Sequence, residues 1–431
     1  MPLHIIGGPK LDFVPTKSLF LMSAQSQIRV AFGSVPKDAG TFTFYRNLRP
    51  ALLGHGIDLR CVSLGRDDAH LCDADYVDEG CHLLVPRSSS LKRQARAFTD
   101  WCKRERIDIV MGINSAGILS ALPHLPANIR VMSRCANAFD HGYRITMSGR
   151  ERLMRIVALS PRLRDDLVAD YGADPARIEL IPNGIDPDRF DDAAARPRGQ
   201  GEELELGFLG RLEHGQKGVL HIPSILDALH ARKVPFRLRI AGKGRDGDQL
   251  RDALAAHEAA GRVAFLGALG PDQIPEFLAE TDVFVFTSRF EGMPNALLEA
   301  MVAGCVPVCF NITGITDFMI EQGQTGSLHD QGDAEALADT IADLARDRAS
   351  LQAQHERGAQ QARARFSNAK AAKAYAALFQ ALMQETPPAV EPRPWRHFQA
   401  DPNFPQTWRR FIPPALKDVV RSGLYSASKR T

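Results

Sequence analysis

Residues 282–301 read D-V-F-V-F-T-S-R-F-E-G-M-P-N-A-L-L-E-A-M. The β-branched and aromatic residues of the first part predict a buried parallel strand over 283–286. Pro294, placed at the first helical position, predicts a helix from Asn295 to Val302. A strand that leads through a short loop into a helix is the unit from which parallel α/β sheets are built.

Two carboxylates make this stretch a candidate site. Glu291 lies on the predicted loop, and Glu299 follows eight positions later within the predicted helix. The N–H groups of residues 295–297 would have no partner inside the helix, so we expect them to bind an anion such as phosphate. The alternative is that residues 288–291 form a capping box and that Glu299 is an ordinary surface residue.

The same alternation of strands and helices occurs twice along the chain. In the first half, strands are predicted at 27–33, 58–64, 107–112, 129–133 and 155–159, and helices at 42–53, 91–106 and 161–171. In the second half, strands are predicted at 204–209, 236–241, 263–266, 283–286 and 306–310, and helices at 334–345 and 370–384. The predicted fold class is therefore α/β, with two Rossmann-like doubly wound domains that face each other across a cleft.

Turn residues and composition place the domain boundaries. Residues 1–26 are expected to be an N-terminal extension, with Met22 as an alternative start. The other divisions are a first domain at 27–190, a linker, a second domain at 204–365, a helix at 366–384 that crosses back to the first domain, and a proline-rich basic tail at 385–431. A basic helix is expected in that tail from Ala415 to Lys429.

Charge is distributed unevenly. The net charge of +2 gives no general reason to expect nucleic acid as a partner. Residues 87–164, however, hold fifteen Arg or Lys against five Asp or Glu, which indicates a surface for an anionic acceptor or for anionic lipid headgroups. The alternative is a solvated face. Five of these basic residues share one predicted helix with two aromatic residues: Lys92, Arg93, Arg96, Lys103 and Arg104, with Phe98 and Trp101.

Cysteine usage and hydropathy indicate a cytoplasmic protein. The seven cysteines include no C-x-x-C pair, so neither a disulfide framework nor a zinc site is indicated. No apolar run reaches the roughly 20 residues of a membrane-spanning helix, so membrane attachment, if any, would be peripheral and on the inner face. Asp73-Ala74-Asp75 is similar to a metal-binding D-x-D motif, but its place in an early loop favours solvent exposure, and no metal or other cofactor is predicted.

A second candidate loop follows the strand at 204–209. Residues 210–218 read G-R-L-E-H-G-Q-K-G, in which flexible backbone lies beside Arg211 and Lys217. Two cations in such a loop suit a pyrophosphate, because they neutralise the charge that grows on it when it leaves. The loop is neither G-x-G-x-x-G nor a Walker motif, which weakens a dehydrogenase or NTPase interpretation.

Both loops resemble motifs of one enzyme family. Residues 291–308 are similar to the Glu-x7-Glu motif of retaining glycosyltransferases with the GT-B fold, family four, and residues 210–218 to the G-R-L-x-x-x-K-G loop of the same family. In that family the first Glu contacts donor-sugar hydroxyls, the second Glu holds the nucleotide ribose, and the Arg and Lys bind the donor diphosphate. The resemblance therefore assigns these roles to Glu291, Glu299, Arg211 and Lys217.

Weaker similarities extend the implied site. They lie in a glycine turn at 240–244, a base-contacting loop at 265–269, a first-domain loop at Gly40, and the I-P-N-G-I-D sequence at 181–186, which marks the interdomain junction. The implied donor-binding residues are Gly40, Gly210, Gly242, Leu269, Gly292, Met293, Asn295, Ala296, Leu297 and Glu299.

The first domain departs from the family pattern. Many relatives have a donor-contacting His after the strand at 130–133, where this chain has Arg134 and Cys135, with His141 several residues later. Either Arg134 takes the role of that His, or the loop brings His141 back to the site. The usual glycine pair after Pro307 is replaced by T-G-I at 313–315.

The resemblance implies a retaining transferase that moves a sugar from a nucleotide donor to a hydroxyl of a glycan or lipid-linked acceptor, without a metal ion, in bacterial cell-surface polysaccharide synthesis. The implied reaction is a same-face displacement in which the leaving phosphate oxygen takes the acceptor proton. The alternatives are a nucleotide-sugar epimerase of similar fold and a non-catalytic sugar-nucleotide-binding partner of a membrane assembly complex.

Overall fold

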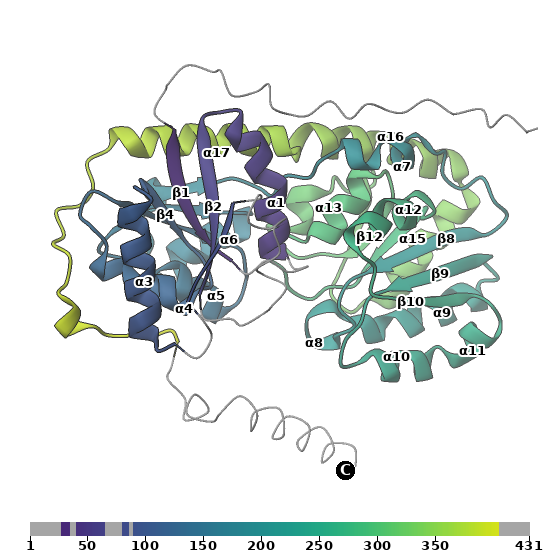
Figure 1. The fold of residues 1–431 in the computed structure, drawn as a ribbon. Coiled ribbons are helices and arrows are strands. Elements are labelled where there is room, and N and C mark those ends of the chain that lie inside the picture. The colour runs from purple at the N-terminus through teal and green to yellow at the C-terminus, as the bar shows by residue number, and fades with distance from the viewer. Residues whose placement is uncertain (1–26, 35–39, 65–79, 86–88, 405–431) are drawn as a thin grey trace, which may run out of the picture.

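The computed structural model describes residues 27–34, 40–64, 80–85 and 89–404. These residues form two lobes side by side, each built on a parallel β-sheet with helices around it (Figure 1). The predicted α/β class with two Rossmann-like domains is confirmed. The predictions for residues 1–26, for Asp73 and Asp75, and for a helix at 415–429 fall outside the described residues.

The sheet of the first lobe has the strand order β3-β2-β1-β4-β5-β6-β7. The strands are β1 Ile28–Gly33, β2 Ile57–Leu64, β3 Cys81–Val85, β4 Ile109–Gly112, β5 Arg130–Cys135, β6 Leu153–Ala158 and β7 Ile178–Leu180. The helices are α1 Gly40–Leu53, α3 Leu91–Arg104, α4 Ala116–Ala121, α5 Asp140–Thr146 and α6 Pro161–Ala169. In the middle of the sheet, Val30 of β1 pairs with Leu59 on one side and Ile109 on the other. These strands are apolar because helices cover both faces of a parallel sheet.

The sheet of the second lobe has the order β10-β9-β8-β11-β12-β13. The strands are β8 Leu204–Leu209, β9 Phe236–Ala241, β10 Val263–Gly267, β11 Val283–Phe286, β12 Val306–Phe310 and β13 Ser327–His329. The helices are α8 His214–Lys217, α9 Ile222–Ala231, α10 Gly247–Ala253, α11 Ala255–Ala259, α12 Ile274–Ala279, α13 Asn295–Val302, α14 Thr316–Met319, α15 Ala334–Arg346 and α16 Arg348–Arg365. Two further helices are α7 Asp191–Ala195, which lies between the two domains in sequence and packs on α12 of the second lobe, and α17 Asn368–Gln384.

Four of the predicted strands, β8, β9, β11 and β12, are confirmed residue for residue. Several elements were not predicted from the sequence, among them strand β3 and helix α9, which has a clear apolar face, and others that are weak in pattern. Strands β7 and β13 have only three residues each. Helix α16 buries small and polar residues, among them His355 and Gly358, in place of a continuous apolar stripe, so its periodicity is not visible in the sequence.

The segment expected to be a linker is fixed to the second lobe by a buried arginine. Arg198 is only 2% exposed. Its guanidinium donates hydrogen bonds of 2.6–3.1 Å to five backbone carbonyl oxygens, those of Ala193, Leu278, Ala279, Thr281 and Ala303. Because a buried charge is stable only when its donors are satisfied, this network ties the segment to two separate parts of the lobe, the end of α12 at 278–281 and Ala303 after α13.

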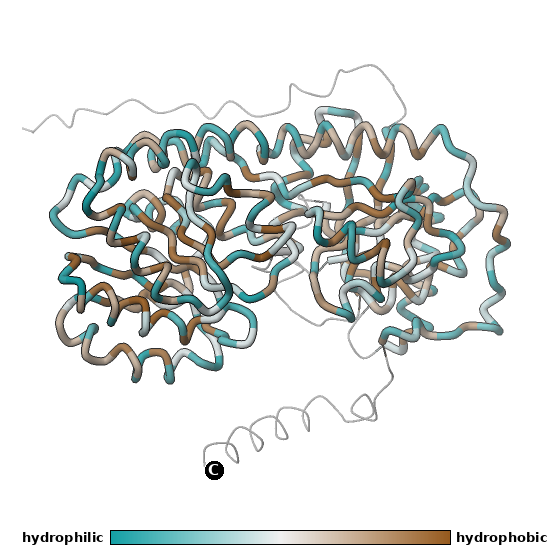
Figure 2. The backbone as a smooth tube through the Cα atoms, turned by 180° about the vertical axis from the view of Figure 1, so that it is seen from behind, coloured by the Kyte–Doolittle hydropathy of each residue, from teal (hydrophilic) through white to brown (hydrophobic). Residues whose placement is uncertain are grey.

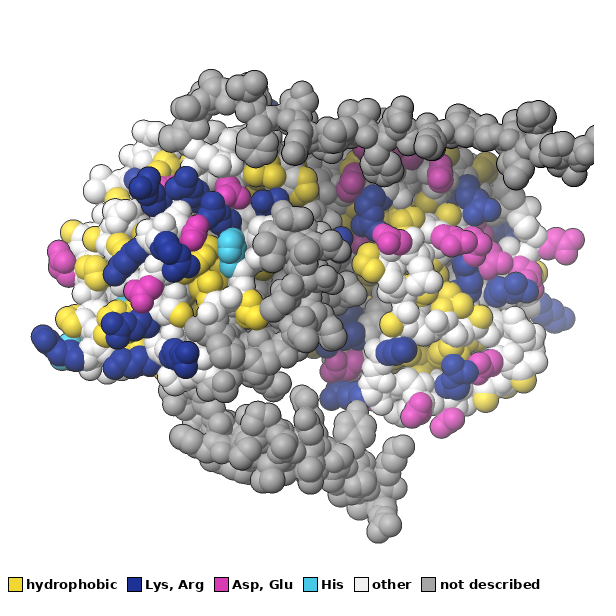
Figure 3. Space-filling view, in the orientation of Figure 1, with side chains coloured by type: hydrophobic (Ala, Val, Ile, Leu, Met, Phe, Trp, Pro, Cys, Tyr) yellow, Lys and Arg dark blue, Asp and Glu magenta, His cyan; other side chains and the backbone are white. Residues whose placement is uncertain are grey.

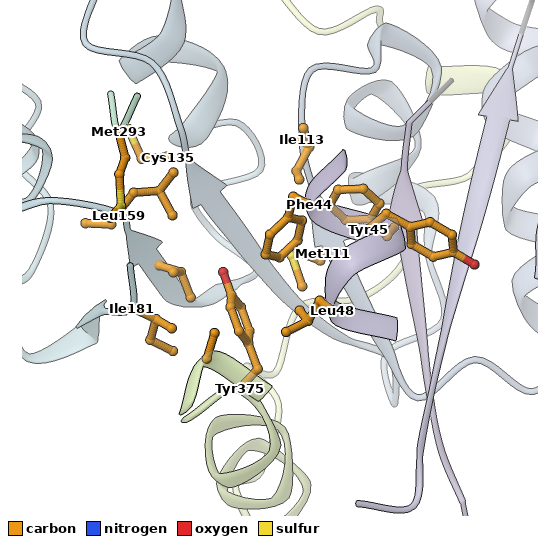
Figure 4. Packing of buried hydrophobic residues seen from close by; sticks show 14 of the residues in the cluster. Phe44, Tyr45, Leu48, Met111, Ile113, Cys135, Leu159, Ile181, Met293 and Tyr375 are labelled. Carbon is orange, nitrogen blue, oxygen red and sulfur yellow. The ribbon is translucent and has the colours of Figure 1, made fainter. Parts of the chain in front are cut away.

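The chain returns to the first lobe at its end. Helix α17 runs along the first lobe and packs against α1, where Tyr375 lies 5.6 Å from the ring of Phe44 (Figures 1 and 4). Residues 385–404 then follow the same lobe, and Trp395 stacks on the His124 ring at 4.2 Å. Helix α17 and residues 385–404 therefore give the lobes a second connection, made by packed side chains, in addition to the junction at 181–186.

The hydrophobic interior is continuous between the lobes. Figure 2 shows the hydrophobic segments concentrated inside each lobe. One buried cluster contains the core of the first lobe together with helix α13 of the second. At the contact, Met293 of the second lobe lies beside Cys135 and Leu159 of the first (Figure 4). This packing holds the start of α13 against the end of β5.

Helix α3 divides its residues between core and solvent. Phe98 and Trp101 are fully buried, whereas Lys92, Arg93, Arg96, Lys103 and Arg104 are exposed. Figure 3 shows Lys and Arg side chains gathered over this part of the first lobe. Among the described residues, no helix combines the length and the apolar character needed to cross a membrane.

Candidate active site

A pocket of about 330 Å³ lies between the lobes. The first lobe contributes the start of α1, the end of β5 with the residues that follow it, and the junction at Asn183. The second lobe contributes the end of α8 and residues 290–296. The pocket therefore brings together the two loops that the sequence singled out and the first-domain segment after β5, for which the sequence left Arg134 and His141 as alternatives.

The strand-to-helix unit has the predicted form with one correction. Helix α13 spans Asn295–Val302 as predicted, but Pro294 is the extended residue before the helix, with φ −77° and ψ 108°, and not its first helical residue. The first amide that bonds within the helix is that of Leu298, to the carbonyl of Pro294 at 3.1 Å. No capping box forms at residues 288–291, because the helix begins four residues later. The N–H groups of Asn295, Ala296 and Leu297 are left at the end of the helix that faces the pocket.

Glu291 and Lys217 form the central ion pair of the pocket. The Lys217 Nζ atom lies 2.5 Å from Glu291 Oε1, and the two side chains are 15% and 8% exposed. Gln216 donates from Nε2 to the other carboxylate oxygen at 3.4 Å. Because this pair is largely removed from water, the attraction between its charges is stronger than that in a surface salt bridge. A ligand group that takes the place of one partner leaves the other partner able to bind a second group of the same ligand.

Arg211 is placed differently from Lys217. Its side chain is 64% exposed and pairs with Glu213 at 3.2 Å. It also donates to Gln216, which in turn contacts Glu291. Arg211 is not among the residues that line the pocket. The structure thus brings Lys217 and Glu291 together and leaves Arg211 at the edge.

Glu299 is buried, so its interpretation as a surface residue is wrong. It is 7% exposed on α13, and burial raises its pKa to about 7, partly offset by the charge of Arg189. A carboxyl with a raised pKa is uncharged in part of the neutral range, because the interior disfavours its charged form. Hydrogen-bond donors of a ligand bound beside Glu299 would favour the charged carboxylate again.

Arg134 is buried at the end of β5 and is held on three sides. Its guanidinium lies 3.8 Å from the centre of the Phe44 ring, donates to Tyr375 Oη at 3.3 Å and donates to Asn183 Oδ1 at 2.5 Å. Phe44 and Tyr375 come from α1 and α17, so the packing of these helices fixes the arginine (Figure 4). Arg134 lines the pocket.

Asn183 connects the lobes within the pocket. Arg134 can only donate, so Asn183 Oδ1 faces it, and Asn183 Nδ2 donates to Asn295 Oδ1 at 2.7 Å. The backbone N–H of Asn183 also points to the sulfur of Met293, at 3.1 Å. The sequence identified Asn183 only as part of the I-P-N-G-I-D junction and gave it no place in the site. The only sequence feature that could have indicated a role for Asn183 in the site is its position directly before a glycine, where the chain turns between the domains.

His141 is not brought to the pocket. It is an exposed residue of α5, and its ring lies edge-on to Phe404 at 5.5 Å. Of the two alternatives left open by the sequence, the structure places Arg134 at the pocket and His141 away from its lining residues. Gly40 begins α1, next to Thr41, which lines the pocket.

Glycines allow two close approaches near the site. Gly292 lies against the backbone of Ala136 in the other lobe, where a Cβ would come within 2.0 Å of the carbonyl oxygen. Gly242 has φ 149°, and a Cβ there would lie 1.8 Å from the Gly210 carbonyl oxygen. Larger residues would therefore separate the lobes at Gly292 and the two strand ends at Gly242. Leu269 lies half-buried at the end of the neighbouring loop.

The T-G-I segment that replaces the family's glycine pair also meets the first lobe. The amide of Arg162, at the start of α6, donates to the carbonyl of Gly314 at 3.2 Å. In the described part of the chain, no group of three or more His, Cys, Asp or Glu side chains is arranged to hold a metal ion.

Each lobe matches a family model. A model described as "Glycosyltransferase Family 4" matches residues 39–189, and one described as "Glycosyl transferases group 1" matches residues 203–347. A glycogen synthase of Mycobacterium tuberculosis is 32% identical over 46% of this chain and 47% of its own length. A GDP-mannose:cellobiosyl-diphosphopolyprenol alpha-mannosyltransferase of Xanthomonas campestris is 30% identical over 44% of this chain and 49% of its own. The chain thus spans about half the length of the curated relatives it matches.

Solved structures share the two-lobe architecture. A glycosyltransferase from Rickettsia africae superimposes with a TM-score of 0.69 at 15% identity, over 84% of this chain and all of the other. Anabaena HepE in complex with UDP and glucose gives a TM-score of 0.65 at 18% identity, over 82% of this chain and all of the other. The two lobes are thus similar to two glycosyltransferase family models, and the arrangement of the lobes is the GT-B fold that these solved glycosyltransferases share.

Proposed function

We propose that this chain transfers a sugar from a nucleoside-diphosphate donor to a hydroxyl of a glycan or lipid-linked acceptor, with retention of configuration at the anomeric carbon. The observation that carries the proposal is the largely buried Lys217–Glu291 pair beside the start of α13. A cation, a carboxylate and the N–H groups of a helix start are the groups that a sugar diphosphate needs at one place.

Lys217 stabilises the leaving group. When the bond between the sugar and the diphosphate breaks, negative charge grows on the phosphate oxygen, and the ammonium group and the α13 N–H groups neutralise it. Lys217 then exchanges its contact with Glu291 for the phosphate. Glu291 is left to accept hydrogen bonds from hydroxyls of the transferred sugar, which orients the anomeric carbon.

The reaction exchanges one carbon–oxygen bond for another on the same face of the sugar. The acceptor oxygen forms a bond to the anomeric carbon while the bond from that carbon to the phosphate oxygen breaks. The acceptor proton passes to the departing phosphate oxygen, so nucleoside diphosphate is the second product. Arg134 is the proposed first-lobe contact of the donor sugar, because it lines the pocket and His141 does not.

Glu299 binds the ribose of the nucleotide. It lies on α13, beyond the helix start that faces the phosphates, and it is buried. Two ribose hydroxyls can donate to its carboxylate, which favours the charged form that burial disfavours.

Donor and acceptor classes are proposed from the relatives. The Xanthomonas relative is named for a GDP-mannose donor and a cellobiosyl-diphosphopolyprenol acceptor, and Anabaena HepE is seen with UDP and glucose. We place this chain accordingly in the synthesis of a bacterial cell-surface polysaccharide, at the inner face of the cytoplasmic membrane. Within α3, attachment there would rest on the basic side chains, since Phe98 and Trp101 belong to the core.

A screen across UDP-, GDP- and ADP-sugars tests the proposal. A ligand bound only by the folded protein raises the unfolding temperature, which identifies the donor. That donor should then release nucleoside diphosphate slowly in water and faster with an acceptor, and release should persist in EDTA because Lys217 and α13 supply the positive charge. Binding without release would indicate the non-catalytic partner, and a new nucleotide sugar would indicate the epimerase. Loss of activity in EDTA with rescue by Mg²⁺ would contradict the metal-free mechanism.

A further inference from the structure

Two exposed phenylalanines lie at the same pocket. Among the described residues, large hydrophobic side chains are exposed at four positions: Leu53, Phe139, Leu266 and Phe290. Phe139 is 44% exposed and Phe290 37%, and both line the pocket between the lobes. Neither ring belongs to a buried hydrophobic cluster.

The two rings come from opposite lobes. Phe139 is the extended residue before α5 in the first lobe, with φ −149° and ψ 154°. Phe290 directly precedes Glu291 in the second lobe, and its carbonyl oxygen lies 3.5 Å from Gln216 Nε2. Both backbones are therefore anchored, one at the start of α5 and one in the loop that carries Glu291, while the rings are only partly covered by the protein.

A ligand for these rings must be both polar and apolar. The rest of the pocket offers charged and amide groups, including Arg134, Lys217 and Glu291. A pyranose ring has hydroxyls around its rim and C–H groups on its faces, so it can satisfy polar groups and cover an aromatic ring at once. Because both exposed rings line the same otherwise polar pocket, a ligand of this kind would cover them while its hydroxyls meet the polar groups.

We propose that Phe139 and Phe290 form the acceptor subsite, in which they contact the faces of the acceptor sugar ring. This inference rests on the proposed transferase function, where Lys217, Glu291 and Glu299 already serve the donor. Because one ring comes from each lobe, the acceptor would be held only when both lobes contribute, next to the anomeric carbon oriented by Glu291.

The test compares phenylalanine variants with a matched leucine. Phe139→Ala and Phe290→Ala remove the rings, and Phe139→Tyr and Phe290→Tyr keep them. Leu53→Ala removes a side chain of similar exposure, 39%, at the far end of α1, about 20 Å along the helix from Thr41 at the pocket. The acceptor probes are the methyl and octyl glycosides of glucose, galactose and mannose, with nucleoside diphosphate release measured with and without each probe.

The alanine variants should raise the acceptor KM by about tenfold or more, because a phenylalanine ring covered by a ligand contributes on this scale. The ratio of transfer to acceptor-free release should fall equally for methyl and octyl probes, recover in the Tyr variants and stay unchanged in Leu53→Ala. A loss confined to octyl probes would show that the rings bind a lipid chain and would overturn the sugar-ring subsite.

Two further outcomes separate this inference from the function on which it rests. If the wild-type protein releases nucleoside diphosphate but the alanine variants use every probe as well as the wild type does, the subsite is wrong and the function stands. If the wild-type protein cleaves no donor, saturation-transfer NMR with the methyl glycosides decides the subsite alone. Signal in the wild type that is lost in Phe139→Ala supports it, and absence of signal in the wild type overturns it.

Discussion

The two lobes build their halves of the pocket in different ways. The second lobe supplies a nearly contiguous set, residues 290–296 with Gln216 and Lys217. The first lobe supplies residues from separate places, the start of α1, the end of β5, the residue after β6 and the interdomain junction. One half of the site therefore depends on a local strand-to-helix unit, and the other depends on how several elements pack.

This difference leads to a division of labour. The helix start and the Lys217–Glu291 pair are local features that suit a ligand part common to many donors, the diphosphate. The Arg134 side chain depends on Phe44, Tyr375 and Asn183, each from a different element. We infer that the second lobe provides the chemistry and that the first lobe orients what reacts.

The largest effect is expected in the second lobe, at Lys217. Lys217→Ala should lower turnover by roughly 10²-fold or more, because it removes a preorganised charge that faces the leaving group. Arg211→Ala should cost less than Lys217→Ala, since its side chain is mostly exposed and already paired with Glu213. Steady-state kinetics with the identified donor measure both, with Lys373→Ala as a surface-lysine control. Wild-type turnover in Lys217→Ala would contradict the division of labour.

The two glutamates should separate nucleotide binding from transfer. Glu299→Gln should weaken binding of free nucleoside diphosphate by roughly tenfold, because the hydrogen bonds to the ribose lose their charge-assisted part. Glu291→Gln should mainly lower transfer, with little change in that affinity. Isothermal titration calorimetry gives the affinities. Equal losses in both variants would show that the glutamates do not have separate roles.

The first lobe should respond through Asn183. Asn183→Ala removes the hydrogen-bond acceptor for Arg134 and the donor to Asn295. We expect turnover to fall by roughly tenfold, because Arg134 and Asn295 would no longer be held in position. Asn368→Ala is the matched control, because Asn368 lies at the same junction, where its Oδ1 has no hydrogen-bond partner. If Asn183 acts through Arg134, the losses in Asn183→Ala and Arg134→Lys should not multiply in the double variant. Fully multiplicative losses would argue for independent roles.

The contrast between the lobes also explains what the sequence could predict. Strands β11 and β12, helix α13 and the loop with Lys217 follow from local pattern, and the resemblance added their implied roles. The connection from Arg134 through Asn183 to Asn295 joins residues 49 and 112 positions apart, which no local pattern encodes. The burial of Glu299 and the anchoring of Arg198 likewise depend on tertiary packing, which is why the alternative of Glu299 as a surface residue was wrong and why no local pattern indicated the anchoring.

A pH effect is expected at Glu299. Its pKa is raised to about 7 by burial, so the folded state binds this proton more tightly than the unfolded state, and between about pH 4.5 and pH 7 its stabilising contribution is lost as pH rises. Ribose hydroxyls favour the charged form, so nucleotide affinity should fall as pH drops from 8 to 6. Calorimetry at several pH values measures this, and Glu299→Gln removes the contribution of this carboxyl. The same pH dependence in both proteins would assign it to the nucleotide phosphate instead.

The smallest effect is expected on the outer face of the first lobe. The exposed basic residues of α3 should bind vesicles with anionic lipids weakly, at about 1 kcal/mol for each residue near the surface, and salt should screen the attraction. Sedimentation of the wild type and of Lys92→Glu/Arg96→Glu with anionic and neutral vesicles measures it. Equal binding to both vesicle types, or none at low salt, would leave α3 as a solvated face.

We expect transfer with retention of configuration at the anomeric carbon, in a pocket where Lys217 and Glu291 act on the donor. Proton NMR of the first product formed from an α-linked nucleotide sugar tests it most directly, read before the released sugar can change its anomeric form or on the glycoside itself. An α-linked product should form together with one nucleoside diphosphate, and both should form much more slowly in Lys217→Ala. A β-linked first product, or an α-linked product formed equally fast in Lys217→Ala, would contradict it.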